Sequence, residues 1–414
     1  MNRPFDIVIL GLSVTSSWGN GHATTYRSLL RGLAARGHRT LFLERNLPWY
    51  AENRDEPNPY GARTEIYESV EDLTARFEFE VANADLVIVG SYVPDGVAIG
   101  AWVNGVAKGV TAFYDIDTPV TMARLREGGT EYITPELIRL YQIYLSFTGG
   151  PLLRDIETRH GARMARALYC SVDTELYLPS VQTTRWDLGY LGTYSSDRQP
   201  ALEELLLQPS RQWKGGRFAV TGPMYPEDFV WPENVDREIH LSPREHPAFY
   251  GAQRFTLNIT RASMKQAGYS PSVRLFEAGA CATPVVSDWW EGFDSLFEVG
   301  REALIASSAD EVLRYLRDVP DAQRLAMGAA ARARILAEHT PERRAIQLES
   351  YVQEFHDHFS SGPSRPDGLP RQDNRLAAGL ASQSARAASG ERAGGKDEKI
   401  SGPGRLHQPA GANR

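Results

Sequence analysis

Residues 270–288, Ser270-Pro-Ser-Val-Arg-Leu-Phe-Glu-Ala-Gly-Ala-Cys-Ala-Thr-Pro-Val-Val-Ser-Asp288, join a helical pattern to a short apolar strand. The helical pattern covers Val273–Ala280, and the apolar run Pro284–Ser287 follows it. Another apolar run, Phe255–Ile259, precedes the helix and is separated from it by a polar, glycine-containing loop. A strand, a helix and a second strand in this order predict a βαβ unit with parallel strands.

The same alternation of apolar runs and helical patterns fills most of the chain, which indicates parallel sheets covered by helices on both faces. Between the first two runs, apolar residues recur at helical spacing from Tyr26 to Leu33, and Gly37 stands where a C-cap glycine belongs. We therefore expect an α/β protein with two doubly wound, Rossmann-like domains that face a cleft. The predicted strands are Ile7–Leu10, Leu41–Leu43, Leu86–Val89, Val110–Tyr114, Tyr144–Phe147 and Ala167–Tyr169, then Leu188–Leu191, Phe218–Thr221, Phe255–Ile259, Pro284–Ser287 and Ala303–Ile305.

The predicted domain boundaries follow from changes in this pattern. Residues 1–184 form the first Rossmann-like domain, residues 185–340 the second, and residues 341–359 an amphipathic helix that packs across the junction. Residues 360–414 contain no aromatic side chain and are dominated by Gly, Pro, Ala, Ser, Arg and Lys. We expect this tail to be disordered, because it cannot bury enough apolar surface to offset the entropy of ordering.

Composition excludes several classes of protein. The chain has 414 residues and a net charge of −7, so its surface as a whole does not attract nucleic acid. It has no apolar stretch long enough to cross a membrane. Its two cysteines are too few for a disulfide framework and lack the spacing of a zinc site. A cytoplasmic location is the simplest expectation.

The loop after the first predicted strand, Gly11–His22, is the first candidate ligand site, because ligands of such sheets bind beyond the carboxyl ends of the strands. It matches neither Gly-x-Gly-x-x-Gly nor a P-loop. Glu44, which follows the second predicted strand, resembles a ribose-binding acid. A dinucleotide-dependent enzyme therefore stays open as a minor alternative.

Two candidate catalytic residues lie in the first domain. His22 begins the first predicted helix, where the helix dipole favours the neutral imidazole that a general base needs. Asp115 and Asp117 follow a predicted strand, and in an extended segment their alternate spacing places both carboxylates on one side. Either His22 or Asp117 is expected to bind or deprotonate an acceptor. A capping role for each of these two residues is the alternative.

The loop before Glu277 has the composition of a diphosphate site. Ser270 and Ser272 offer hydroxyl groups near a helix N-terminus, and Lys265 and Arg274 supply positive charge, with Arg261 beside them. Glu277 either accepts hydrogen bonds from ribose hydroxyls or forms an ion pair with Arg274 on the same helix.

The run from Ser270 to Asp288 resembles the C-terminal domain of GT-B glycosyltransferases, in the branch related to the spore-maturation protein CgeB. The resemblance covers about residues 5–355. The other segments that carry it are Asn20–His22, Gly37–His38, Tyr190–Tyr194 and Gly300–Leu304.

The resemblance implies roles for the second domain. Glu277 matches the residue that binds the donor ribose, and the loop before it matches the segment that holds the diphosphate and the sugar. Gly192 and Thr193 match the turn that faces the donor phosphates, and Arg198 stands near the place of a basic phosphate ligand. The segments that match regions lining the nucleobase are Thr221-Gly222 and His240–Ser242.

The chain departs from the wider superfamily at one position. Retaining members carry a second glutamate eight positions before the first, where this chain has Tyr269. The donor sugar, and whether the reaction retains or inverts configuration, therefore stay open.

The function that the sequence predicts is a metal-independent glycosyltransferase of the hexosyltransferase type. Its donor is a nucleotide-diphosphate sugar, held mainly by the second domain, and its acceptor is an unidentified glycan, lipid or protein. No cofactor, metal ion or nucleic acid is expected to take part. The alternatives are a nucleotide-sugar epimerase of the same fold and a non-catalytic surface-assembly or scaffold protein on a decayed GT-B fold.

Overall fold

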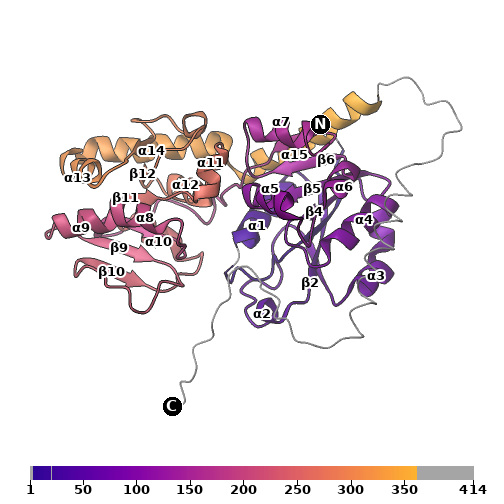
Figure 1. Ribbon diagram of the computed structural model, residues 1–414, viewed down its shortest axis with the longest axis horizontal. Coiled ribbons are helices and arrows are strands. Elements are labelled where there is room, and N and C mark those ends of the chain that lie inside the picture. The colour runs from indigo at the N-terminus through magenta and orange to yellow at the C-terminus, as the bar shows by residue number, and fades with distance from the viewer. Residues whose placement is uncertain (1–2, 20, 361–414) are drawn as a thin grey trace, which may run out of the picture.

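The computed structural model describes residues 3–19 and 21–360. They form two α/β domains side by side, each with a central parallel sheet between layers of helices (Figure 1). The structure therefore confirms the predicted fold class. The tail that the sequence predicts to be disordered lies outside the described residues, apart from the helix end at residue 360.

The first domain has a seven-stranded sheet with the order β3-β2-β1-β4-β5-β6-β7, in which every pair of neighbours is parallel. Its strands are β1 (Asp6–Gly11), β2 (Arg39–Arg45), β3 (Arg63–Tyr67), β4 (Leu86–Gly90), β5 (Val110–Asp115), β6 (Ile143–Ser146) and β7 (Ala165–Ala167). Its helices are α1 (Gly21–Ala35), α2 (Pro48–Ala51), α3 (Val70–Asn83), α4 (Gly96–Val106), α5 (Thr118–Glu127), α6 (Pro135–Leu140) and α7 (Pro151–Thr158).

The second domain has a six-stranded parallel sheet with the order β10-β9-β8-β11-β12-β13. Its strands are β8 (Trp186–Leu191), β9 (Phe218–Thr221), β10 (Val235–Glu238), β11 (Gln253–Asn258), β12 (Val285–Ser287) and β13 (Ala303–Ile305). Its helices are α8 (Gln199–Leu202), the π-helical η1 (Glu203–Leu207), α9 (Gln208–Gln212), α10 (His246–Gly251), α11 (Ala262–Ala267), α12 (Val273–Ala280), the 3-10 turn η2 (Phe293–Ser295), α13 (Ala309–Asp318) and α14 (Asp321–Glu338).

Two strands, β3 and β10, were not predicted from the sequence, and both lie at an edge of their sheet. An edge strand has a neighbour on one side only, and its exposed positions carry polar residues. β3 reads Arg-Thr-Glu-Ile-Tyr and β10 reads Val-Asp-Arg-Glu, so neither shows an apolar run. The strand expected at Ala167–Tyr169 lies slightly earlier, as β7.

The helix α15 (Pro341–Ser360) follows the second domain but packs on α1 of the first. Glu349 on α15 accepts hydrogen bonds from Arg36 and from the ring of His38, the latter at 2.8 Å between Nε2 and Oε1. Tyr177, in the segment between the two sheets, belongs to the same apolar cluster as Phe276 on α12. The two domains thus share a continuous core at their junction.

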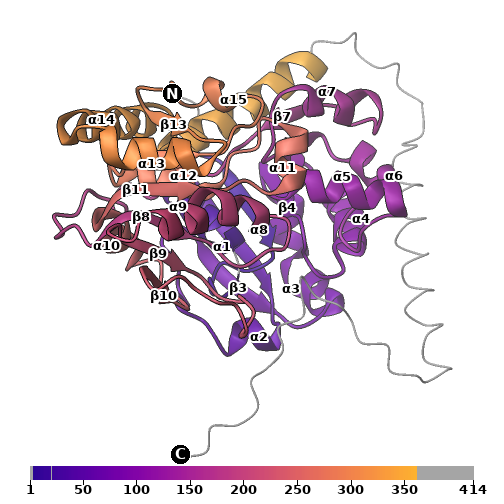
Figure 2. The same ribbon diagram turned by 60° about the vertical axis from the view of Figure 1, so that its left-hand side comes forward.

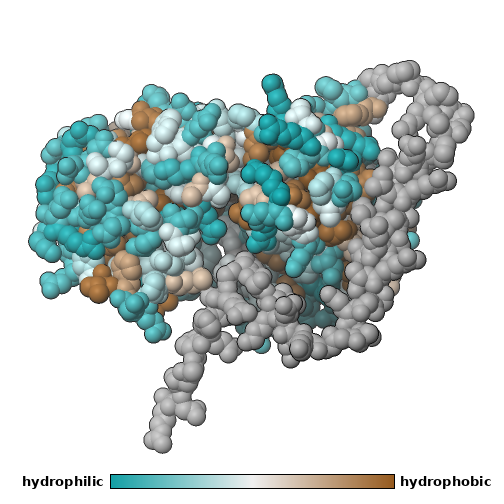
Figure 3. Space-filling view, viewed as in Figure 1, coloured by the Kyte–Doolittle hydropathy of each residue, from teal (hydrophilic) through white to brown (hydrophobic). Residues whose placement is uncertain are grey.

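The surfaces of both domains are mainly hydrophilic in the view of Figure 3, with apolar side chains in small separate groups. Within residues 3–19 and 21–360, no helix is long and apolar enough to span a lipid bilayer.

Candidate functional site

Each sheet has one point where the strand order reverses, and the candidate residues follow the strands near these points. In the first sheet the reversal lies between β1 and β4, and in the second it lies between β8 and β11. The loops that follow such neighbouring strands diverge, which leaves a crevice for a ligand at the carboxyl edge of the sheet. His22 follows β1, Gly192 follows β8, and the loop that leads to α12 follows β11.

The structure brings His22 and Asp117 into contact. His22 lies in the first turn of α1 and Asp117 directly precedes α5, yet His22 Nε2 is 3.1 Å from Asp117 Oδ2. The side chain of His22 is 10% exposed and that of Asp117 is 43% exposed, so the carboxylate is the member of the pair that solvent reaches. The ring of Tyr92 packs edge-on against the imidazole. A buried imidazole beside an accessible carboxylate is a suitable pair for moving a proton.

An arginine of the second domain lies near this pair. Burial raises the pKa of Asp117, but His22 and the charges of Arg261 and Arg124 outweigh burial and lower the pKa. Arg261 directly precedes α11, and α11 packs against α5 across the junction of the domains (Figure 2). The pair in the first domain therefore faces a positive charge from the second.

Asp115 does not share a face with Asp117, contrary to the expectation from their spacing. The chain turns directly after β5, so Asp115 points into the core with no exposed surface. Asp115 Oδ2 accepts a hydrogen bond from Tyr144 Oη at 2.5 Å, and Oδ1 accepts one from Thr121 Oγ1 at 2.8 Å. The backbone N–H of Asp117 donates to the same carboxyl group. Asp115 thus holds the turn that carries Asp117.

Asp115 is expected to make the stability of the fold depend on pH. Burial raises the pKa of Asp115 to about 7, whereas the unfolded carboxyl group titrates near its ordinary pKa of 3.8. The folded state therefore keeps a proton that the unfolded state has lost, and the free energy of unfolding falls as the pH rises between these values. Relative to Asp115→Asn, the wild type should lose about 2–3 kcal/mol between about pH 5 and about pH 7.5. Urea unfolding of both proteins at the two pH values measures this difference. Equal losses in the free energy of unfolding of the two proteins would show that the pKa of Asp115 is not raised in the folded state.

Glu44 is not available for a ribose. It has no exposed surface, and its carboxylate accepts hydrogen bonds from the backbone N–H groups of Val14 and Thr15 at 2.6 and 3.0 Å. The hydroxyl groups of Ser13 and Thr15 donate to it as well. Glu44 therefore orders the loop that leads to His22. The dinucleotide alternative loses the residue on which it depended.

Two arginines enclose the turn after β8. Arg274 Nε donates to the carbonyl oxygen of Leu191, and Arg198 Nη2 donates to that of Thr193, both at 2.5 Å. Arg274 also lies over the ring of Tyr190, 4.8 Å from its centroid. Burial lowers the pKa of Arg198, and the neighbouring charges of Arg274 and Arg261 lower it further. Its Nε is buried, with no hydrogen-bond partner among the described residues.

Gly192 and Gly222 let the ends of β8 and β9 approach closely. A Cβ on Gly222 would overlap the carbonyl group of Gly192, and the φ of Gly222 is +144°, which side-chain-bearing residues rarely adopt. A Cβ on Gly192 would contact the hydroxyl group of Tyr190 and Nη2 of Arg274. Both predicted glycines therefore keep backbone at the carboxyl edge of the sheet close to the arginines.

Asn258, at the end of β11, organises the start of α12. Its Oδ1 accepts hydrogen bonds from Ser272 Oγ at 2.6 Å and from Arg274 Nη1 at 3.0 Å. Lys265 lies further from this group and forms an ion pair with Asp288, at 3.1 Å between Nζ and Oδ2. Lys265 therefore lies in the same segment between β11 and α12, and its ammonium group is paired with the carboxylate of Asp288.

Glu277 is buried between aromatic hydroxyl groups. Tyr177 Oη and Tyr250 Oη each donate to one oxygen of its carboxylate, both at 2.9 Å, and His246 Nδ1 lies 3.7 Å from Oε2. Burial raises the pKa of Glu277, but His246 and the two tyrosines outweigh this and lower it. The ion pair with Arg274 that the helical spacing allowed is absent from the ion pairs of the described residues. A carboxylate has about four lone-pair sites, so the carboxylate retains acceptor capacity for a ligand.

Ser270 and Tyr269 connect the two domains. Ser270 is buried, and its Oγ lies 2.9 Å from Oγ1 of Thr148 in the first domain. The ring of Tyr269 lies where a Cβ on Gly150 or on Gly292 would stand, between the first domain and the loop after β12. Tyr269 has a φ of +46°, and its carbonyl oxygen accepts the N–H of Gly149 at 2.9 Å. These contacts hold the loop before α12 against the first domain.

Several residues of the site were not predicted from the sequence. Asn258 is a polar residue one position before the end of the apolar run Phe255–Ile259, which is the one local signal that was available for it. Tyr177, His246 and Tyr250 are distant in sequence from Glu277, and nothing in their local pattern connects them with it. Within the described ranges, no group of three His, Cys, Asp or Glu side chains could hold a metal ion.

Comparison with known proteins shows a family match for part of the chain. Residues 198–350 match the model of a family described as "Glycosyl transferase-like". The matched segment contains the arginines beside the β8 turn and Glu277. No curated protein matches the chain.

Solved structures match over both domains. An alpha-glucosyltransferase solved in complex with UDP-glucose and DNA superposes with a TM-score of 0.64 and 11% identity, over 85% of this chain and 100% of that one. Sucrose-phosphate synthase from Thermosynechococcus elongatus gives a TM-score of 0.59 and 14% identity, over 86% of this chain and 100% of that one. Anabaena HepE in complex with UDP and glucose gives a TM-score of 0.59 and 13% identity, over 84% of this chain and 99% of that one. The fold is therefore that of GT-B proteins.

Proposed function

We propose that this protein is a glycosyltransferase that moves a sugar from a nucleoside diphosphate donor to an acceptor bound by the first domain. The family match over residues 198–350 and the GT-B fold support the reaction class. The three structures compared above include complexes with UDP or UDP-glucose, which supports a nucleotide-sugar donor for this chain. Membership of the CgeB-related branch stays a prediction from the motif around Glu277.

The observation that carries the proposal is the group of arginines at the end of β8. Arg198 and Arg274 bracket the turn at Gly192, and Arg261 is close enough to affect the pKa of Arg198. Three neighbouring guanidinium groups with one adjacent carboxylate, that of Asp197, leave a net positive charge that attracts an anion. The unpartnered, buried Nε of Arg198 offers such an anion a hydrogen bond. A diphosphate supplies both the charge and the acceptor oxygens.

The same cations can supply the electrostatic part of catalysis. Breaking the bond between the sugar and the diphosphate places negative charge on the departing phosphate oxygens. Guanidinium groups already fixed by Leu191, Thr193 and Asn258 stabilise that charge without having to reorient. We therefore propose that departure of the diphosphate is assisted by these side chains and needs no metal ion.

The first domain would supply the acceptor side. His22 and Asp117 lie near Arg261, so an acceptor hydroxyl bound at Asp117 would stand close to the donor. The ionised Asp117 can accept the proton of that hydroxyl group, and His22 holds the carboxylate in place. The contacts of Tyr269 and Ser270 keep the two halves together while water is excluded.

Thermal unfolding in the presence of nucleoside diphosphates and their sugars tests the donor site. A ligand at one hundred times its dissociation constant should stabilise the wild type by roughly 2.7 kcal/mol. Arg198→Gln should lower this stabilisation by about 1.4 kcal/mol, because affinity falls about tenfold. Arg211→Gln is the matched control, at an exposed arginine on α9 that pairs with Glu203. It should leave the stabilisation by the ligand unchanged.

The scaffold alternative gives a different result in that experiment, and the epimerase alternative is separated from a transferase by the products formed from the donor. A scaffold protein on this fold would show no stabilisation by any nucleotide. An epimerase would bind a donor and convert it with no acceptor present and without releasing nucleoside diphosphate.

A further inference from the structure

Tyr92 lies where the first sheet reverses its strand order, between β1 and β4. It follows β4 as His22 follows β1. The residue before it, Ser91, is buried, and its Oγ accepts the backbone N–H of Ile116 at 3.2 Å. Tyr92 itself has a φ of +62°, which residues with a large side chain rarely adopt. Contacts with the loop after β5 therefore hold Tyr92 in a strained conformation at the edge of the sheet.

The ring of Tyr92 links His22 to Arg124. It packs edge-on against the imidazole, with 5.6 Å between the two ring centroids, and the guanidinium carbon of Arg124 lies 5.8 Å from the centroid of the tyrosine ring. A guanidinium group at this distance from an aromatic ring is attracted to it. Burial raises the pKa of Tyr92 to about 12, and the charges of Asp117 and Arg124 shift it in opposite directions. Arg124 therefore stands beside the pair that we assign to the acceptor.

The helix α5 also places Arg124 near Asp117. Asp117 directly precedes this helix and Arg124 lies seven residues later, which is about two turns, so the two residues share a face. Helical side chains lean toward the N-terminus, which brings the guanidinium group closer to Asp117. Among the ion pairs of the described residues, Asp117 is matched with His22 and not with Arg124.

The guanidinium group of Arg124 keeps its hydrogen-bonding capacity. Arg124 is exposed, and within the described parts of the chain its side chain forms neither a hydrogen bond nor an ion pair. An aromatic ring thus positions the cation, and its N–H groups stay open to a ligand. The planar fork of N–H donors matches the two oxygens of a carboxylate or of a phosphate. An acceptor that carries such a group supplies the missing counter-charge.

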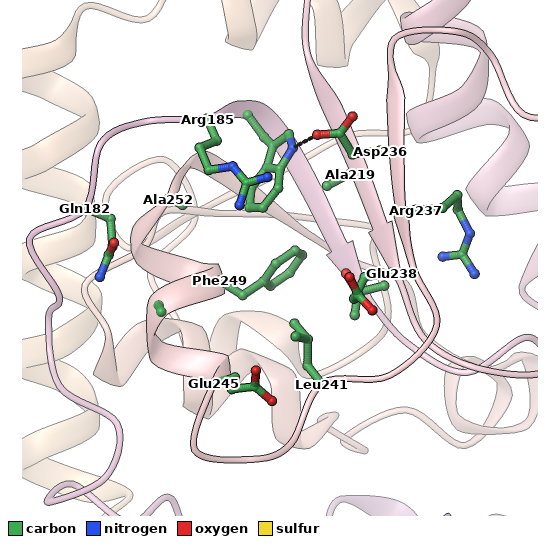
Figure 4. Close-up of a pocket in the computed structure, with 13 residues that line it drawn as sticks. Gln182, Arg185, Ala219, Asp236, Arg237, Glu238, Leu241, Glu245, Phe249 and Ala252 are labelled. Carbon is green, nitrogen blue, oxygen red and sulfur yellow. Dashed lines mark hydrogen bonds between the residues drawn. The ribbon is translucent and has the colours of Figure 1, made fainter.

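A groove beside α10 in the second domain has the opposite character. Its volume is about 570 Å³, and Figure 4 shows the carboxylates around it, those of Asp236, Glu238 and Glu245. Its two arginines already have partners. Arg185 lies over the ring of Trp186, 4.2 Å from the centroid, and Arg237 donates to the carbonyl oxygen of Gly222 at 3.0 Å. An anionic acceptor is therefore expected to bind at Arg124 and not in this groove.

We propose that Arg124 binds an anionic group of the acceptor, a phosphate or a carboxylate, and makes the protein specific for an acidic acceptor. The proposal rests on the function proposed above and names the acceptor class of that site. With the anion held at Arg124 in bidentate fashion, a hydroxyl group elsewhere on the same acceptor unit lies at Asp117, which takes its proton. Arg124 thus selects and orients the acceptor, and Asp117 acts on it.

Transfer to separated acceptor pools tests the inference. Glycan, lipid and protein fractions are each divided by an anion-exchange resin into a neutral and an acidic pool, and the full chain is assayed on every pool with UDP-, GDP-, ADP- and dTDP-sugars. Labelled acceptor should appear in an acidic pool. Arg124→Gln should raise the KM for this pool about 10- to 100-fold, because it loses charge-assisted hydrogen bonds, and should leave the KM for the donor unchanged. Arg126→Gln is the matched control, at another exposed arginine in the last turn of α5, and should change neither value.

Chemical treatment of the acidic pool identifies the anion. Cold aqueous hydrofluoric acid removes phosphate groups, and carbodiimide coupling to a neutral amine masks carboxylates. The treatment that removes the anion should weaken transfer by the wild type and abolish its advantage over Arg124→Gln, since the two changes remove the same interaction.

The outcomes separate this inference from the proposed function. Transfer to a neutral pool, or an unchanged KM in Arg124→Gln, overturns the acidic acceptor and leaves the transferase proposal standing. Equal losses in Arg124→Gln and Arg126→Gln also overturn it, because they would reflect the stability of α5. An advantage of the wild type over Arg124→Gln that survives both treatments overturns it as well. Failure to release nucleoside diphosphate with any pool contradicts the proposed function, and the inference falls with it.

Discussion

Replacing Asp117 by asparagine is expected to lower the rate of sugar transfer by about 100- to 10,000-fold and to leave donor affinity unchanged. Asparagine keeps the size of the side chain and can still contact His22 Nε2, which lies 3.1 Å from the carboxylate. It cannot accept the proton of an acceptor hydroxyl group. The proposed donor contacts lie in the second domain, so the loss should appear in the turnover number and not in nucleotide binding.

Asp95→Asn is the matched control for this substitution. Asp95 precedes α4 as Asp117 precedes α5, neither side chain caps its helix, and their exposures are similar, at 52% and 43%. Asp95 pairs with Arg45, away from His22. The control should transfer sugar at the wild-type rate. A loss of donor affinity in Asp117→Asn, or an unchanged rate, would remove Asp117 from the reaction.

Glu277→Gln is expected to weaken nucleotide binding by about 10- to 100-fold, which corresponds to about 1.5–3 kcal/mol for a hydrogen bond to a charged acceptor. The substitution preserves shape, and the hydroxyl groups of Tyr177 and Tyr250 can rotate to suit an amide. The amide has one acceptor atom where the carboxylate has two. The ribose hydroxyl groups that we propose to donate to Glu277 would therefore lose a charged partner.

Glu302→Gln controls for the burial of Glu277. Glu302 is also a buried glutamate of the second domain, and its carboxylate accepts hydrogen bonds from Arg334 and from the backbone of Glu298. It should lower stability without changing the dissociation constant of the nucleotide. Isothermal titration of both variants separates the two effects. Equal affinities of Glu277→Gln and wild type would show that the carboxylate serves the core alone.

The sequence predicted the architecture because buried parallel strands carry continuous apolar runs. β4, for example, reads Leu-Val-Ile-Val-Gly and is buried along its whole length. The edge strands β3 and β10 were not predicted, because polar residues occupy their exposed positions. Pairing between strands cannot be read from such segments, since it depends on contacts that are distant in sequence.

The site was predictable where chemistry and chain position coincide. His22 and Asp117 each follow a strand, and parallel strands bring their carboxyl ends to one edge, so their contact follows from the topology. The turn that sends Asp115 into the core was not predictable from spacing, because alternation holds only while the chain stays extended. The tyrosines around Glu277 come from the linker and from α10, and only the folded structure joins them.

The central claim is that the protein transfers a sugar from a nucleoside diphosphate, and one measurement tests it most directly. The full chain is incubated with UDP-, GDP-, ADP- and dTDP-sugars and heat-treated glycan, lipid and protein fractions, and released nucleoside diphosphate and labelled acceptor are quantified. We predict that one donor yields both products in equal amounts and that Asp117→Asn forms both at least about 100-fold more slowly. Recovery of every donor intact, or of an epimerised donor without release of nucleoside diphosphate, would contradict the account.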